Sequence, residues 1–252
     1  MKRVFLNYLV IAALSVVAAL MSCSNEKIQL PESTTYSDGR TERYEYDNEN
    51  RIAKILYCDK SGTMTYSYAI TYSGDNFIKS VLTTGFDSAF VATVEYSKSG
   101  NKITVTIKSN NRDSIDTAIV DLDNDGFPTK YEAITDVVSS VGVYEIHSGN
   151  LTKHSYKVVR VGAMTLEGSD DCKYDNKKSP FFQCKTPKWW WILSDKCMST
   201  QNNVIERSKN SGEKIEYKYE FDNAGYPTKC TAKYNNGESV NEFKYKRLNA
   251  ST

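Results

Sequence analysis

The sequence predicts an all-β fold: a long antiparallel meander of about 14–16 strands that rolls or closes into a barrel-like sheet. Three observations predict it. Eighteen tyrosines with only five prolines, and frequent Thr, Val and Ile, make a composition typical of strands. Many segments alternate apolar and polar residues with a period of two. A turn phrase rich in Asp, Asn and Gly recurs along the chain.

The turn phrase is clearest in three copies, which cover residues 46–54 (YDNENRIAK), 122–130 (LDNDGFPTK) and 221–229 (FDNAGYPTK). Weaker copies begin at residues 72, 96, 146 and 174, so successive copies from 46 to 174 start 24 to 28 residues apart. A period of this length holds two strands and two turns. We therefore expect every phrase to lie at the same end of the sheet.

The segments between the phrases have one apolar and one polar face. In residues 102–108 (KITVTIK), Ile103, Val105 and Ile107 take one face, while threonine and lysine take the other. A membrane-spanning porin would present an apolar band outward, whereas the outward positions here are Lys, Thr, Ser and Glu. The pattern predicts a water-soluble barrel with its apolar face inside and one irregular insertion near residues 175–205.

The N-terminus has the features of a lipoprotein signal. Basic residues Lys2 and Arg3 precede an apolar run over residues 4–20, which ends in Leu20-Met21-Ser22-Cys23. We expect cleavage after residue 22 and lipidation of Cys23. An uncleaved transmembrane helix is the alternative, but the 17-residue run is at the lower limit of the roughly 17–25 residues that a span requires.

The predicted domain organisation follows from this signal. Residues 23–40 are polar without periodicity and predict a lipid-anchored flexible tether, which leaves residues 41–248 as a single β-repeat domain. Ser24 after the lipid cysteine resembles the outer-membrane sorting pattern of Gram-negative lipoproteins. We expect an envelope protein anchored to the outer membrane, and the sequence leaves open whether it faces the periplasm or the cell surface.

Charge and cysteine content restrict the partners and the chemistry. Without Lys2 and Arg3 the chain has 30 basic and 31 acidic residues, which argues against a nucleic-acid partner. Beside Cys23 there are five cysteines, and Cys172, Cys184 and Cys197 cluster in one segment. A disulfide among these three is the first expectation, with the pairing left open. A metal site is the rival, although no Cys-x-x-Cys pair occurs.

Four stretches together resemble a known family. They are residues 44–51 (YEYDNENR), 174–181 (YDNKKSPF), 202–204 (NNV) and 225–229 (GYPTK). Their order is similar to that in Bacteroidetes lipoproteins of an uncharacterised domain family described as having a porin-like fold. The resemblance covers about residues 40–248 and implies a porin-like barrel without established catalytic residues. The turn phrase is also similar to the Tyr-Asp repeats of large secreted toxins.

One copy of the turn phrase matches the calcium-loop pattern D-x-[DN]-x-[DN]-G-x5-E. Asp121, Asp123, Asp125 and Glu132 supply the carboxylates, which are the ligands that calcium prefers. The equivalent copy at residues 220–231 has the same turn and exit but has alanine and threonine at two of these positions. We therefore favour a hairpin turn, and a calcium site is the alternative.

Few other residues predict a site. The run Trp189-Trp190-Trp191 favours a plug that packs across the apolar face, and a glycan-stacking platform is the alternative. Of the two histidines, His154 is expected to face Glu145 across a hairpin with a loop at residues 149–150. No nucleophile elbow, phosphate loop or zinc-protease motif occurs, so the sequence predicts neither an enzyme nor a cofactor.

Three functions remain open at this point. The leading hypothesis is a non-enzymatic envelope lipoprotein that binds a ligand or scaffolds a complex, with a small apolar ligand as one candidate. The second is a glycan-binding accessory lipoprotein that uses Trp189–Trp191. The third is an enzyme whose site is assembled only in the folded chain.

Overall fold

The computed structural model describes residues 28–74, 76–84, 91–110, 112–135, 138–162, 165–194 and 201–248. Residues Leu30–Lys246 form one compact unit. The predicted signal peptide, Cys23 and Cys197 lie outside the described residues.

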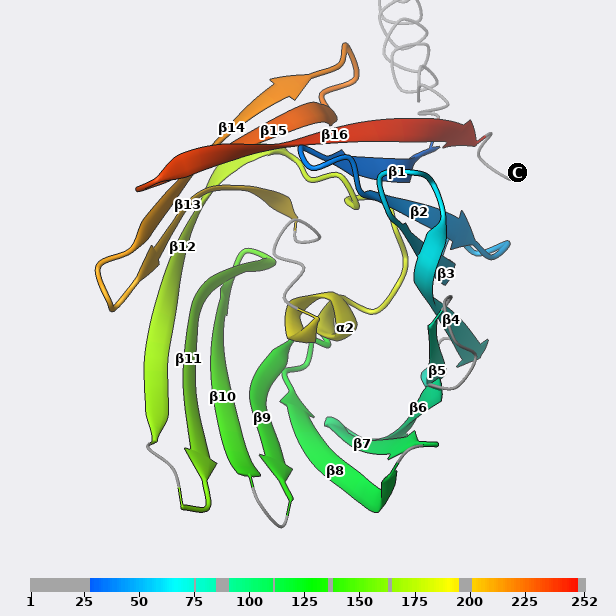
Figure 1. The fold of residues 1–252 in the computed structure, drawn as a ribbon, viewed down its shortest axis with the longest axis vertical. Helices are drawn as coiled ribbons and strands as arrows, with labels where there is room; N and C mark the ends of the chain where they lie inside the picture. The colour runs from blue at the N-terminus through cyan, green and yellow to red at the C-terminus, as the bar shows by residue number, and fades with distance from the viewer. Residues whose placement is uncertain are drawn as a thin grey trace, which may run out of the picture. The chain divides into compact units, whose positions relative to one another are not determined.

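The fold is a closed antiparallel barrel of 16 strands in which each strand pairs with the next along the chain and β1 lies beside β16 (Figure 1). This confirms the predicted all-β meander, and closure removes the free edges that invite aggregation. The strands are β1 (Ile28–Tyr36), β2 (Thr41–Tyr46), β3 (Ile52–Cys58), β4 (Met64–Ser73), β5 (Asn76–Thr84), β6 (Val91–Ser99), β7 (Lys102–Ser109), β8 (Arg112–Leu122), β9 (Pro128–Ile134), β10 (Val138–His147), β11 (Asn150–Arg160), β12 (Leu166–Lys178), β13 (Asn202–Lys209), β14 (Lys214–Phe221), β15 (Pro227–Tyr234) and β16 (Gly237–Leu248).

The first strand corrects the predicted boundary of the tether. Residues 28–36 fall within the segment 23–40 that was expected to be flexible, yet they form β1 and pair with β2. Leu30 is fully buried, and the buried Thr34 hydroxyl lies 3.0 Å from the hydroxyl of Tyr44. A polar strand without alternation is stabilised here by partners supplied from β2 and β16, which its own sequence does not reveal.

The three strongest turn phrases form the same hydrogen-bonded turn. The Oδ1 atoms of Asp47, Asp123 and Asp222 each accept hydrogen bonds of 2.9–3.0 Å from the backbone N–H groups two and four residues later. Gly126 and Gly225 have φ of 80° and 82°, a conformation that favours glycine. These turns join β2 to β3, β8 to β9 and β14 to β15, so all three lie at the same end of the meander, as predicted.

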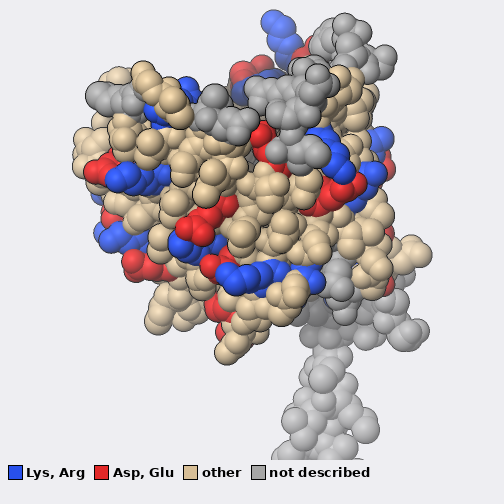
Figure 2. Space-filling view, turned by 90° about the horizontal axis from the view of Figure 1, so that it is seen from below, with Lys and Arg blue, Asp and Glu red and all other residues tan. Residues whose placement is uncertain are grey.

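The two faces of the barrel wall follow the predicted alternation. In β7, Ile103 and Val105 are buried while Thr104 and Lys108 are exposed. Ion pairs join outward side chains of neighbouring strands, for example Lys173–Glu206 at 2.9 Å and Lys229–Glu220 at 2.9 Å. Figure 2 shows acidic and basic side chains intermixed on one face of the molecule. Separately, none of the helices among the described residues is long and apolar enough to span a bilayer.

A plug fills part of the barrel. The connection between β12 and β13 contains the one helix among the described elements, α2 (Lys188–Leu193), and Figure 1 shows it inside the ring of strands. Trp191 packs on Phe181, with ring centroids 4.6 Å apart, and Phe181 meets Tyr44 of the wall at 5.1 Å. A helix that is apolar on every side is stable only when it is surrounded, and here the wall surrounds it. The predicted irregular insertion is therefore confirmed.

Candidate functional site

The interior of the barrel is not uniformly apolar, which corrects the predicted apolar inner face. The inner side of β2–β9 contributes most of the aliphatic and aromatic cluster that packs on the plug. The inner side of β10–β13 instead carries histidine, aspartate, arginine and lysine side chains. Because charged groups are costly to bury and cluster at functional sites, this second half of the interior is the candidate functional site.

Four cross-strand partners form a row across β10–β13, which we name the polar rung. Tyr144 lies opposite His154, His154 opposite Asp170, and Asp170 opposite Lys209. Side chains of directly opposed residues share one face of the sheet, so all four project to the same side. That side is the interior, because all four line an internal chamber together with residues of the plug.

The chamber has a volume of about 390 Å³, within the range of roughly 300–1,000 Å³ that is usual for small-molecule sites. The wall supplies its polar side, and Leu151 with the plug residues Ile192 and Leu193 supplies its apolar side. The complete lining is Tyr144, Leu151, His154, Tyr156, Asp170, Cys172, Ile192, Leu193, Arg207 and Lys209.

A buried ion pair lies in the wall of the chamber. Arg207 Nη2 is 2.7 Å from Asp170 Oδ2, and the two side chains are 20% and 6% exposed. Lys209 Nζ lies 2.6 Å from Glu213 Oε2, so the charged side chains that line the chamber are each balanced. The other carboxylate oxygen, Asp170 Oδ1, is buried and has no hydrogen-bond partner among the described residues. Buried acceptors in native proteins nearly always have a partner, so this atom is a candidate to receive a ligand.

Two glycines inside strands make room for the aromatic groups of the site. A Cβ on Gly168 would lie 2.5 Å from the Tyr156 hydroxyl, and one on Gly142 would lie 3.0 Å from the Tyr144 hydroxyl. The Tyr144 and His154 rings stack with centroids 4.7 Å apart and planes 3° from parallel. Glycine weakens a strand, and it is used where another group approaches the backbone closely.

The position of His154 corrects the predicted hairpin. His154 was expected to face Glu145, but it faces Tyr144, and Glu145 pairs with Lys153. The two-residue loop consists of Ser148 and Gly149, with φ of 51° and 78°, one position earlier than expected. A bulge follows between Glu145 and Ile146. Because a shift of one residue exchanges the two faces of a strand, this bulge changes which residue lies opposite His154, and His154 lines the chamber.

The calcium-loop carboxylates do not converge. Asp121 pairs with Lys102 and Glu132 pairs with Lys130, both on the outer face, while Asp123 caps its own turn. Asp125 lies beside a different pocket at the end of the barrel. Among the described residues no group of three or more His, Cys, Asp or Glu is arranged to hold a metal ion.

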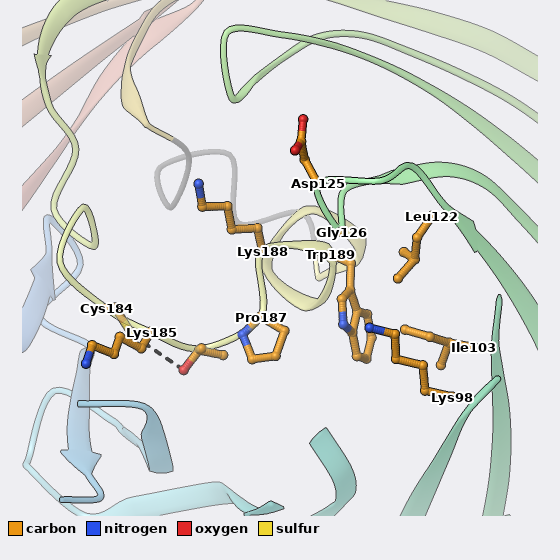
Figure 3. Close-up of a pocket in the computed structure, with 11 residues that line it drawn as sticks. Lys98, Ile103, Leu122, Asp125, Gly126, Cys184, Lys185, Pro187, Lys188 and Trp189 are labelled. Atoms are coloured by element: carbon orange, nitrogen blue, oxygen red, sulfur yellow. Dashed lines mark hydrogen bonds between the residues drawn. The ribbon is translucent and has the colours of Figure 1, made fainter. Parts of the chain in front are cut away.

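That second pocket, of about 440 Å³, lies between the wall and the plug. Figure 3 shows Trp189 lying against Ile103 and Lys98, with Asp125 and Lys188 pointing in other directions. The Lys188 amino group lies 4.9 Å from the centre of the Phe127 ring. Because its charged groups do not converge on one point, this pocket is a weaker candidate than the chamber.

The tryptophans and cysteines predicted as sites are mostly buried. Trp189, Trp190 and Trp191 are 6%, 7% and 2% exposed, which fits the packing interpretation and not an exposed platform. Cys172 lines the chamber and Cys184 lies in the plug, and neither forms a disulfide among the described residues. Burial raises the pKa of Cys184 to about 11. Any bridge to Cys197 lies outside the described residues.

Comparison with known proteins supports the fold. No family profile matches the chain, and no curated protein matches it. The solved structure of a porin-like protein from Bacteroides uniformis ATCC 8492 superposes with a TM-score of 0.52 at 14% identity, over 87% of this chain and 96% of that one. A porin-like protein from Bacteroides vulgatus ATCC 8482 gives 0.44 at 11% identity, over 86% and 99%. The first likeness confirms the porin-like fold that the sequence resemblance implied.

Proposed function

We propose that this chain is an envelope lipoprotein that binds a small uncharged polar ligand, a saccharide or similar polyol, inside its barrel. The observation that carries the proposal is the buried Asp170 Oδ1, which has no partner among the described residues, beside Arg207 in the wall of the 390 Å³ chamber. The glycan hypothesis thus moves from the tryptophans to the polar rung.

The chemistry of the chamber favours a polyol. A hydroxyl group both donates and accepts, so it matches a carboxylate acceptor and a guanidinium donor that lie side by side. The apolar side formed by Leu151, Ile192 and Leu193 suits the C–H face of a sugar ring. The charges of Asp170 and Lys209 are already balanced by Arg207 and Glu213, so a charged ligand would find no net attraction.

The remaining part of the proposal concerns the location. The Leu20–Cys23 pattern supports lipidation of Cys23, and the following Ser24 supports anchoring in the outer membrane. Outward ion pairs on the wall support a barrel that stands in water beside the membrane. The anchor is tested by Cys23→Ala, which should abolish membrane fractionation. A variant that still carries an acylated N-terminus and partitions into detergent like the parent would contradict it.

Ligand binding is tested with the mature protein and a panel of mono- and disaccharides. At least one sugar should raise the melting temperature and give a saturable calorimetric isotherm; a ligand at a hundred times its Kd stabilises by about 2.7 kcal/mol. Asp170→Asn should weaken this binding at least tenfold. The matched control is Asp171→Asn, because Asp171 is exposed on the same strand. Equal binding by Asp170→Asn and the parent would contradict the proposal.

A further inference from the structure

A second row of cross-strand partners, this one with a glutamate, lies across β1–β4. In the closed barrel these strands are separated from the chamber strands β10–β13 by several strands on either side. Thr34 is the cross-strand partner of Glu42, Glu42 of Tyr57, and Tyr57 of Tyr66. Glu42 of β2 is only 5% exposed, although glutamate side chains are rarely buried unless they are paired. We name Glu42 with Tyr36, Tyr57 and Tyr66 the tyrosine box.

The carboxylate of the box is held by phenol groups. The Tyr36 hydroxyl donates to Glu42 Oε1 at 2.5 Å, and the Tyr44 hydroxyl donates to Oε2 at 2.8 Å. The rings of Tyr57 and Tyr66 stack with centroids 4.1 Å apart and an angle of 18° between planes. The four residues of the box line a cavity of about 460 Å³, whose complete lining is Tyr36, Arg40, Thr41, Glu42, Tyr57, Cys58, Thr65 and Tyr66.

The box combines one carboxylate, that of Glu42, with three neutral phenols. Burial first, and then the nearby Glu42 carboxylate, raise the pKa of Tyr36, Tyr57 and Tyr66, so the three phenols stay neutral at physiological pH. Neutral aromatic rings present electron-rich faces, which attract a cation within about 6 Å. A buried carboxylate adds to this attraction, because a low local dielectric strengthens charge interactions.

We propose that the tyrosine box binds an organic ammonium ion. Aromatic rings beside a carboxylate are an arrangement that recognises such cations, and each cation–π contact contributes about 0.5–2 kcal/mol. A hard metal ion would instead need several oxygen ligands, and both oxygens of Glu42 already accept hydrogen bonds from phenols.

Arg40 marks the entrance of the box. Its guanidinium carbon lies 5.9 Å from the centre of the Tyr36 ring, and its Nε lies 2.7 Å from Asp38 Oδ2. The Arg40 side chain is 69% exposed, so it stands at the rim and leaves the cavity beside Glu42 open. The guanidinium of Arg40 already lies over the Tyr36 ring. Because it carries a positive charge, it would repel a bound ammonium ion.

The test compares choline with its uncharged isostere 3,3-dimethylbutan-1-ol, by calorimetric titration of the mature protein. Choline should bind at least tenfold more tightly than the isostere, and Glu42→Gln should remove this preference. Arg40→Gln should bind choline several-fold more tightly, because it removes a positive charge at the rim. Glu45→Gln is the matched control, since Glu45 is exposed on the same strand.

The outcomes separate this inference from the proposed function. Asp170→Asn should leave choline binding unchanged, and Glu42→Gln should leave sugar binding unchanged. Equal affinity for choline and the isostere would overturn the inference, as would full choline binding by a folded Glu42→Gln variant. If Glu42→Gln fails to fold, the isostere comparison and Arg40→Gln decide, and Arg40→Gln binding choline no better than the parent would count against the inference.

Discussion

The ion pair of Asp170 and Arg207 should contribute little net stability to the barrel, although breaking it should be costly. Taking two charges out of water costs several kcal/mol each, and their attraction only about repays this. The structure places both side chains largely out of solvent, at 6% and 20% exposed. Asp170→Leu would leave the guanidinium without its 2.7 Å partner, and Arg207→Met would do the same to the carboxylate.

The magnitude follows from the burial of each partner. Removal of one member of a buried pair costs about 3–5 kcal/mol, and the partial exposure of Arg207 places the expected loss at about 3 kcal/mol. The double variant Asp170→Leu/Arg207→Met removes both charges and fills the same space with apolar groups. It should lie within about 1 kcal/mol of the parent, far below the sum of the two single losses.

Urea denaturation of the three variants measures these free energies of unfolding. With a slope of about 1–3 kcal/mol per molar urea, a single variant should lower the midpoint by about 1 M or more. Single losses below about 1 kcal/mol would refute the reasoning, because the pair would then be screened by water. A double variant that loses the sum of both would also refute it, because additive losses would mean that the two side chains do not interact.

Three further predictions concern packing and protonation. Gly142→Ala should lower the free energy of unfolding by about 1–3 kcal/mol in urea melts, because its Cβ would crowd the Tyr144 hydroxyl at 3.0 Å; an unchanged midpoint would mean that the rings move freely. Val105→Asp should unfold or severely destabilise the domain, since a buried valine contributes about 1.5–3 kcal/mol and an unpaired buried carboxylate costs more. Thr104→Asp, at an exposed position of the same strand, should leave stability nearly unchanged. Circular dichroism of both variants measures the difference. Burial raises the pKa of the Cys184 and Cys230 thiols to about 11 from an ordinary value of 9, so only the unfolded chain loses these protons above about pH 9. Their contribution to the free energy of unfolding is complete below pH 9 and is lost as pH rises to about 11. In a variant with both thiols replaced by alanine, the free energy of unfolding should fall less steeply over this window. An identical fall in parent and variant would contradict the assignment.

Much of the fold could be predicted because it depends on local patterns. Alternation in segments such as residues 102–108 fixes which side chains enter the interior, and the Asp carboxylate of each turn phrase supplies the hydrogen bonds that close the hairpin. The first strand could not be predicted in this way. Residues 28–36 have no alternation, and their place depends on closure between the two ends of the chain.

The candidate site was missed because it depends on register between strands. His154, Asp170 and Lys209 are 16 and 39 residues apart in sequence, and only pairing across β11, β12 and β13 aligns them. The one-residue bulge in the β10–β11 hairpin, which the sequence does not reveal, brings His154 opposite Tyr144 instead of Glu145. Gly142 and Gly168 were a usable signal, since glycine inside a strand indicates a close approach.

The most direct test of the account uses the two histidines of the chain as reporters of ligand binding. His154 lines the chamber, whereas His147 is exposed outside it. In nuclear magnetic resonance spectra of the mature protein, a bound saccharide should shift the imidazole signals of His154 and leave those of His147 in place. Shifts at His147 alone, or saturable sugar binding without any change at His154, would contradict a ligand site inside the barrel.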